Sequence, residues 1–321
     1  MIPAMLARSV VPAVLALAAT AAGCSFNKIV ADNMAASFED STVAFNREGS
    51  PRHAREASPA LLKMLDGFIV SSPENPDLLL KGAEMNATFA FAFIEKEDQD
   101  WARELYRKAR DYAMRGLATE DETLHAALTA KDAKTREAAL KPALAAADED
   151  DVRAVFWTAF AWGGLINMSR SDIAAAADLP LVVAMMERVA QLDPDYNFAG
   201  SHLFLGVYHA RAGRTLGGDP KRSEAHFREV FKRTRDRFLI AYELYAEYTC
   251  VALGETEPER ARAEFTRALT HVVAAPADID PEQRLANAIA KERAAALLPQ
   301  LDDLIFPPLP PEPDGPGGGT R

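Results

Sequence analysis

Apolar residues recur every three or four positions along most of this chain, and short stretches with proline or glycine interrupt them. This spacing places apolar side chains on one face of a helix and predicts an all-α protein. Joints such as 193–195 and 217–220 are short, so successive helices should be antiparallel neighbours that stack as hairpins. The predicted helices span 26–45, 61–69, 79–93, 101–117, 152–168, 179–192, 197–211, 223–233, 238–253, 259–273 and 282–298.

Alanine makes up 61 of the 321 residues, whereas only 8% are aromatic. Alanine is the best helix former, while strands favour β-branched and aromatic side chains. Some alanines also fit the second helix of a tetratricopeptide unit, A-x3-F-x2-A, in which small residues lie where two helices cross. Segments 102–109 and 261–268 fit this pattern, and 182–189 and 223–230 fit it loosely. The sequence predicts degenerate tetratricopeptide-like repeats, an α-solenoid whose concave face binds partners.

Two polar segments lie between the predicted hairpins. Residues 119–147 are rich in alanine and charge, and we expect helix at the surface or a partly irregular course around Pro142. Four acidic residues, 148–151, precede the strongest apolar stretch. We expect them to cap the helix that begins at Val152, because they lack the ligand spacing and the glycine of a calcium loop.

The first 23 residues have the features of a secretory signal, with a positive residue followed by an apolar run too short to span a bilayer. Small residues lead directly to Cys24, which is typical of bacterial lipoproteins, although Ala21 stands where leucine is usual. We expect a mature chain with a lipidated Cys24; the alternative is an ordinary signal peptide. Ser25, in place of aspartate, favours the outer membrane of a Gram-negative cell.

The remaining chain is predicted to form one helical domain, 24–306, followed by a tail, 307–321, rich in proline and glycine and therefore disordered. If Cys24 carries lipid, Cys250 has no disulfide partner. It lies in an apolar stretch, and we expect a small buried side chain rather than a nucleophile.

Charge and motifs exclude several functions. The net charge is −11, with 36 basic and 47 acidic residues, so nucleic acid is not an expected partner. Neither H-E-x-x-H nor G-x-S-x-G occurs, and the glycines at 217–218 lack the P-loop arrangement. His202 and His209 are seven residues apart, so one ion would need a further element to use both, and packing or surface roles are expected. We predict a protein with no enzymatic activity, metal or cofactor.

Phe156, Trp157, Phe160, Trp162 and Asn167 form the candidate surface for a ligand or partner. Aromatic walls with few polar groups suit a small apolar ligand. Helical periodicity turns Trp162 away from the face shared by Trp157 and Phe160, so one face must be core. The alternative is that all five side chains fill the helix stack.

Several segments together carry a family signature, namely 151–172 (DVRAVFWTAFAWGGLINMSRSD), 192–196 (LDPDY), 202–210 (HLFLGVYHA) and 217–220 (GGDP), with 58–80, 102–117, 241–250, 284–290 and 302–304 in addition. In their order and spacing they resemble the T-component lipoproteins of TRAP (tripartite ATP-independent periplasmic) transporters.

This resemblance implies a lipid-anchored, all-helical periplasmic protein with degenerate tetratricopeptide repeats that associates as a homotrimer. It also implies work with the transporter's periplasmic solute-binding protein and the handling of a small hydrophobic ligand. No catalytic residues come with it. The alternative from the repeats alone is a generic scaffold lipoprotein for envelope protein complexes.

Overall fold

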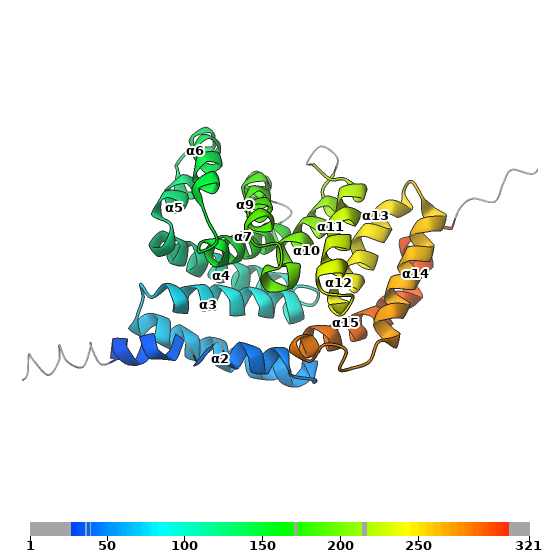
Figure 1. Ribbon diagram of the computed structural model, residues 1–321, viewed down its shortest axis with the longest axis horizontal. Coiled ribbons are helices and arrows are strands. Elements are labelled where there is room, and N and C mark those ends of the chain that lie inside the picture. The colour runs from blue at the N-terminus through cyan, green and yellow to red at the C-terminus, as the bar shows by residue number, and fades with distance from the viewer. Residues whose placement is uncertain (1–26, 36, 39, 170–171, 214–216, 308–321) are drawn as a thin grey trace, which may run out of the picture. The chain divides into compact units, whose positions relative to one another are not determined.

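A computed structural model describes residues 27–307, except 36, 39, 170–171 and 214–216 (Figure 1). The regular structure of these residues is entirely helical, which confirms the all-α prediction. The predicted signal peptide, Cys24 and the tail beyond 307 lie outside them. A first helix runs over 27–46, with gaps at 36 and 39. The α-helices that follow are α2 (Pro51–Ser71), α3 (Pro76–Phe89), α4 (Gln99–Glu120), α5 (Glu122–Thr129), α6 (Ala133–Ala146), α7 (Val152–Asn167), α8 (Ile173–Ala176), α9 (Leu179–Leu192), α10 (Tyr196–Arg211), α11 (Pro220–Arg233), α12 (Leu239–Leu244), α13 (Val251–Gly254), α14 (Pro258–Ala274), α15 (Arg284–Leu297) and α16 (Leu301–Leu304).

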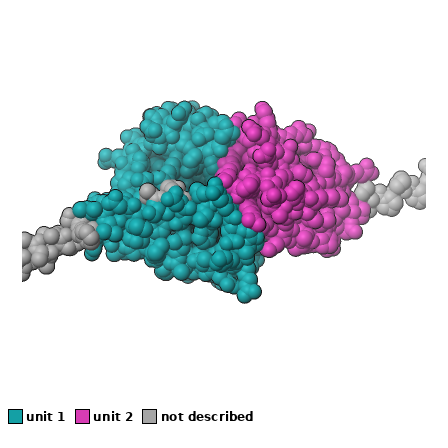
Figure 2. Space-filling view, turned by 60° about the horizontal axis from the view of Figure 1, so that its bottom comes forward, with its two compact units in different colours: residues 1–197 teal, residues 198–321 magenta. Residues whose placement is uncertain are grey.

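The chain divides into two compact units, 1–197 and 198–321, which are coloured separately in Figure 2. Each unit contains an α-helix that continues directly into a π-helix. In unit 1, α3 runs into η1 (Ala90–Ile94), and in unit 2, α12 runs into η3 (Tyr245–Cys250). The single domain over 24–306 stays a prediction.

Helix pairs build unit 1. Helix α3 packs against its sequence neighbours α2 and α4, while α4 also packs against α7, which follows α5 and α6 in the chain (Figure 1). Helices α5 and α6 form a further pair. Glycine permits the closest approach: a Cβ atom on Gly164 would lie 2.3 Å from the ring of Tyr106. Helices α4 and α7 can therefore cross here only without a side chain at this position.

Unit 2 repeats this construction. Helix α14 packs against α13, α15 and η3, and α12 packs against α15. Helices α10 and α11 meet where a Cβ atom on Gly206 would lie 2.8 Å from the ring of Phe227. The hydroxyl of Ser223 donates a hydrogen bond of 2.7 Å to the carbonyl oxygen of Gly206 and fixes this crossing.

The residues of the four repeat motifs are all buried, as side chains between crossing helices should be. The structure supports helix pairing at these positions, while their assignment as tetratricopeptide repeats stays a prediction. The motif residues are Ala102, Tyr106, Ala109, Val182, Met186, Val189, Ser223, Phe227, Val230, Ala261, Phe265 and Ala268.

Helix α6 continues through Pro142 with mostly exposed residues, which agrees with the expectation of a helix at the surface, while Leu140 and Leu144 are buried. One local expectation, the capping of α7 by the acidic residues before it, differs from the structure. The carboxylate of Asp151 does not cap α7. It accepts a hydrogen bond of 2.9 Å from the backbone N–H of Asp148 and closes the preceding turn.

Other helix starts carry side-chain caps of the expected kind. Asp98, Asp121 and Asp132 each accept a hydrogen bond from the backbone N–H three residues later, at 3.0, 2.9 and 2.9 Å. These bonds satisfy donors that have no partner within the helix. In the described part of the chain, no helix combines the length and apolar character needed to cross a membrane.

Candidate functional site

The predicted ligand surface lies on α7, and three of its aromatic side chains form one cluster. Ring centroids are 5.0 Å apart for Phe156 and Trp157, 5.9 Å for Phe156 and Phe160, and 5.7 Å for Trp157 and Phe160. Two further rings extend the cluster: Phe91 of η1 lies 6.0 Å from Phe160, and Tyr196 lies 5.1 Å from Phe156. Sequence spacing could not place Phe91 or Tyr196 here, because both belong to other elements.

The other two predicted residues lie apart from this cluster. Trp162 is on another face of α7, as helical periodicity predicted, and its ring centroid is 5.9 Å from the guanidinium carbon of Arg110 on α4. Asn167 is the last residue of α7 and is partly exposed. Phe156, Trp157 and Trp162 are only 0, 5 and 7% exposed, so they belong to the core of the chain as it stands.

Phe160 is the accessible one of the three clustered rings on α7. It is partly exposed and packs on the same core as Met85, Phe91 and Phe93. We call these four side chains the apolar edge. Two of them lie on η1, and such π-helical turns occur frequently at functional sites because they change which way side chains point. Phe160 is the residue of the predicted surface that belongs to this apolar edge.

The crossing of α4 and α7 keeps this region rigid. Tyr106 lies over Gly164 and is 1% exposed, and its hydroxyl donates a hydrogen bond of 2.8 Å to Glu95 directly after η1. One side chain therefore connects α4, α7 and the end of η1. Gly164, adjacent to the tryptophans in the sequence, has a packing role here.

Comparison with known proteins identifies the family of this chain. The sequence model of the family described as "TRAP transporter T-component" matches residues 47–305. The chain belongs to this family. A protein of Treponema pallidum (strain Nichols), described as uncharacterized, is 21% identical to this T-component over 281 residues, which cover 83% of this chain and 84% of that protein. Family membership gives the chain an accessory role in a TRAP transporter.

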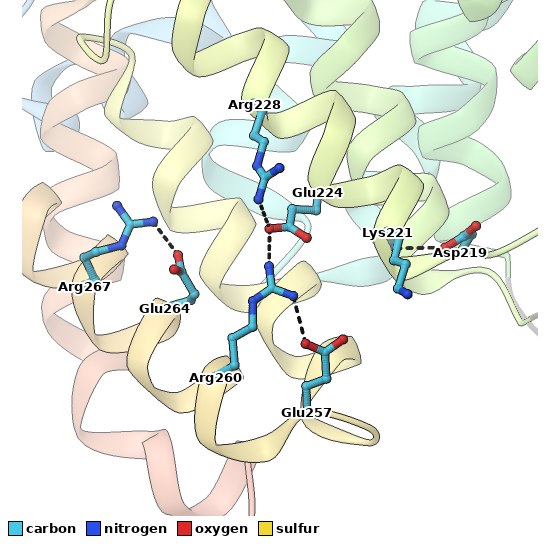
Figure 3. Close-up of polar contacts among 8 residues, drawn as sticks. All are labelled: Asp219, Lys221, Glu224, Arg228, Glu257, Arg260, Glu264 and Arg267. Carbon is cyan, nitrogen blue, oxygen red and sulfur yellow. Dashed lines mark hydrogen bonds and ion pairs between the residues drawn. The ribbon is translucent and has the colours of Figure 1, made fainter.

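Unit 2 of the T-component contains a charged cluster, which Figure 3 shows. Glu224 of α11 is 8% exposed and forms ion pairs with Arg228 at 2.5 Å and with Arg260 of α14. Arg260 also pairs with Glu257 at 2.9 Å. The hydrogen bonds of Glu224 and Glu257 raise the pKa of the Arg260 guanidinium. The pairs connect α11 with α14, and both arginines remain in contact with solvent, so we assign the cluster a structural role.

Three histidines of unit 2 also lie together, which sequence analysis did not predict. The Nδ1 atoms of His202 and His226 are 3.0 Å apart, and the rings of His209 and His226 stack at 5.5 Å. Burial, together with the neighbouring His202 and His209 and with Arg222, lowers the pKa of His226 from 6.5 to about 4. The seven-residue spacing of His202 and His209 did not indicate that His226, on the next helix, packs against both of them.

Cys250 has the environment predicted for it. It is a free thiol at the end of η3 and is fully buried. Burial raises the pKa of this thiol, so the reactive thiolate does not form near neutral pH. The prediction of a buried structural cysteine is confirmed.

Proposed function

We propose that this T-component is a lipid-anchored, non-enzymatic accessory protein that docks the periplasmic solute-binding protein of its transporter. The observation that carries the proposal is the family match over 47–305, which spans nearly all of the described helices. Paired helices offer extended surfaces for another protein, which suits docking better than chemistry. In this proposal the protein forms a homotrimer and binds or passes a small hydrophobic solute.

Docking is tested by pull-down with the solute-binding protein encoded beside this gene. We expect co-purification at micromolar concentrations, and light scattering of the T-component alone should give three chains per particle. Failure to co-purify at these concentrations would count against the transporter role. Retention of envelope-assembly proteins instead would favour the scaffold alternative.

Anchoring is proposed through Cys24, at the end of the signal-like segment 1–23. Cells grown with labelled palmitate should incorporate the label into the wild-type protein, and this labelled protein should be recovered in the outer-membrane fraction. The C24A variant should lose both label and membrane association. Equal labelling of the two proteins would show that lipid, if present, is attached elsewhere.

Ligand binding is proposed at the apolar edge, because Phe160 and Phe91 combine partial exposure with aromatic contact at 6.0 Å. The rigid Tyr106–Gly164 crossing beside them limits the reorganisation that binding would require. Trp157 supports Phe160 from below the surface, at 5.7 Å. Substitution of Trp157 should therefore weaken binding by disturbing Phe160 as well as by removing apolar area.

The test begins with organic extraction of purified protein and mass spectrometry of the co-extracted molecules. Affinity for the identified molecule, or for a fluorescent fatty-acid probe, is then compared among wild type, F160A, W157A and F231A. Phe231 is a partly exposed aromatic residue of unit 2 that stacks on Tyr242 at 3.9 Å, so it serves as a matched control. F160A should lose affinity while keeping its helical circular dichroism and melting temperature. If F160A binds the probe as the wild type does, or if its affinity falls only in proportion to its stability, the aromatic side chains of α7 have a packing role and form no binding site.

A further inference from the structure

The two histidines at the crossing of α10 and α11 have the geometry of a chelating pair. His202 lies on α10 and His226 on α11, and their Nδ1 atoms face each other at 3.0 Å. Both side chains are partly exposed, so solvent and dissolved ions can reach them. Neither belongs to the apolar edge or to the Glu224 cluster.

The helix crossing holds this pair in place. Gly206 lies one turn after His202, and Phe227 directly follows His226; these two residues are in the tight contact described above. Ser223 adds its hydrogen bond to the carbonyl oxygen of Gly206. Farther along α10, the carbonyl oxygen of His209 accepts a hydrogen bond of 2.9 Å from the backbone N–H of Asp219. The separation of the two imidazoles is therefore set by the backbone crossing and needs little reorganisation on binding.

Their separation matches a particular coordination geometry. The two nitrogens are 3.0 Å apart, so a metal ion about 2.1 Å from each of them would have an N–metal–N angle of about 90°. This is the angle between neighbouring ligands in square-planar or tetragonal sites, which Cu²⁺ and Ni²⁺ prefer, whereas tetrahedral Zn²⁺ needs nitrogens farther apart. We propose that His202 and His226 form a two-imidazole site for a divalent metal of the Cu²⁺ or Ni²⁺ type, which would lock α10 to α11.

Protonation and ligand number are consistent with this site. A histidine binds metal only through an unprotonated ring nitrogen, so binding is tested above the ordinary pKa of imidazole. For coordination through both Nδ1 atoms, the ring that donates through Nδ1 shifts that proton to Nε2 through solvent, so this tautomer change releases no net proton. The described residues include no group of three or more His, Cys, Asp and Glu side chains that could hold a metal, so water completes the coordination. His209 directs its own Nδ1 to the carbonyl oxygen of Gly217, at 3.0 Å, and stacks on His226 without serving as a ligand.

The experiment titrates purified protein with Cu²⁺ at pH 7.5 and reads affinity by calorimetry and the number of nitrogen ligands by electron paramagnetic resonance. All proteins carry C24S, so that this thiol cannot reduce or bind copper. The wild-type site should bind one ion with two imidazole nitrogens and raise the melting temperature, since a ligand that binds only the folded state stabilises it. H202Q and H226Q should each lose about tenfold or more in affinity, equal to about 1.4 kcal/mol.

H53Q is the matched control, because His53 is an exposed histidine of unit 1 that pairs with Glu48. It should bind copper as the wild type does. Two substitutions on different helices keep the test decisive if one of them impairs folding, which circular dichroism detects. The proposal is overturned if a folded H202Q or H226Q protein binds Cu²⁺ within tenfold of wild type, or if the spectrum contains no imidazole nitrogen.

Discussion

The two units use the same backbone devices around different side chains. Each has a π-helix that continues an α-helix, and each has a glycine beneath an aromatic ring where two helices cross. In unit 1 the crossing of Gly164 and Tyr106 borders an apolar, aromatic cluster. In unit 2 the crossing of Gly206 and Phe227 borders histidines, a buried Ser223–Thr249 hydrogen bond of 2.7 Å and the charged Glu224 cluster.

Helix pairing supplies the scaffold in both units, and the residues beside each crossing determine whether a change of volume or a change of pH destabilises it. A core of packed rings responds to volume, because interiors are close-packed and relax little. A helix crossing that contains partly buried imidazoles responds to pH, because a charge there is less well solvated than in water. We therefore expect steric substitutions to affect unit 1 more strongly, and acid to affect unit 2 more strongly.

The largest expected effect is steric. G164A places a methyl group 2.3 Å from the ring of Tyr106, which is 1% exposed and cannot move aside, so we expect a loss of about 3 kcal/mol in the free energy of unfolding. G206A meets Phe227 at 2.8 Å and should cost about 1 kcal/mol, because a smaller shift relieves the overlap. Urea unfolding with unchanged m-values measures both.

Gly67 provides the control for these substitutions. It lies exposed in α2, and a Cβ atom there would have nothing within 4 Å. G67A should therefore stabilise the protein by about 1 kcal/mol through helix propensity alone. If G206A proved more harmful than G164A, the contrast between the two crossings would be wrong.

The next effect is pH-dependent and belongs to unit 2. The pKa of His226 is about 4 in the folded protein and 6.5 when unperturbed, so below pH 6.5 the unfolded state binds more protons than the native state. Stability is full above pH 6.5 and falls as the pH decreases toward 4. We expect a loss of about 2 kcal/mol over this window, allowing for partial solvent screening of the ring.

Hydrogen exchange resolves this loss by unit. Amides of α10 and α11 should lose protection between pH 6.5 and 4, after correction for intrinsic exchange, while those of α4 and α7 change less. H226Q should make the stability of α10 and α11 less dependent on pH. An equal pH dependence in wild type and H226Q would assign the effect to other groups.

The sequence predicted much of the scaffold, because helix formation and pairing depend on local spacing. The A-x3-F-x2-A pattern found crossing residues such as Ala102, Ala109 and Ala261, all of them 0% exposed. The aromatic stretch on α7 was also found, with Trp162 correctly placed on another face than Trp157.

Contacts between elements distant in sequence were not predictable in the same way. Phe91 reaches Phe160 from η1, and His226 reaches His202 from a helix 24 residues later; no periodicity within one helix indicates either contact. Asp151 closes its own turn instead of capping α7, because an aspartate can bond to any nearby N–H and the sequence does not say which.

A smaller effect compares two tyrosine hydroxyls that donate to carboxylates. The hydroxyl of Tyr242 in unit 2 donates a hydrogen bond of 2.6 Å to the carboxylate of Asp236. Asp236 lies in a turn in which Arg235 and Asp236 have φ angles of 53° and 59°. Y242F should cost about 1 kcal/mol, because the lost bond also supports this left-handed turn. The hydroxyl of Tyr112 in unit 1 donates a hydrogen bond of 2.9 Å to Asp66. Asp66 also accepts a hydrogen bond of 2.5 Å from Lys108, so Y112F should lower the free energy of unfolding by less than Y242F does.

Chemical denaturation of the two variants at pH 7 measures this difference. Burial together with the adjacent carboxylate raises the pKa of each tyrosine, so at pH 7 both hydroxyls remain hydrogen-bond donors. A greater loss in Y112F than in Y242F would mean that the lysine does not compensate for the missing hydroxyl of unit 1.

The smallest expected effects are gains. Thr158 of unit 1 and Ser201 of unit 2 are both 0% exposed, and neither hydroxyl oxygen has a hydrogen-bond partner. T158V and S201A remove these buried polar groups, and each should raise the free energy of unfolding by about 0.5 kcal/mol, with S201A gaining more because alanine is the better helix former. The urea midpoint at a constant m-value measures the change. A loss in either variant would indicate that its hydroxyl has a partner, such as a buried water molecule, and that the polar core extends to that position.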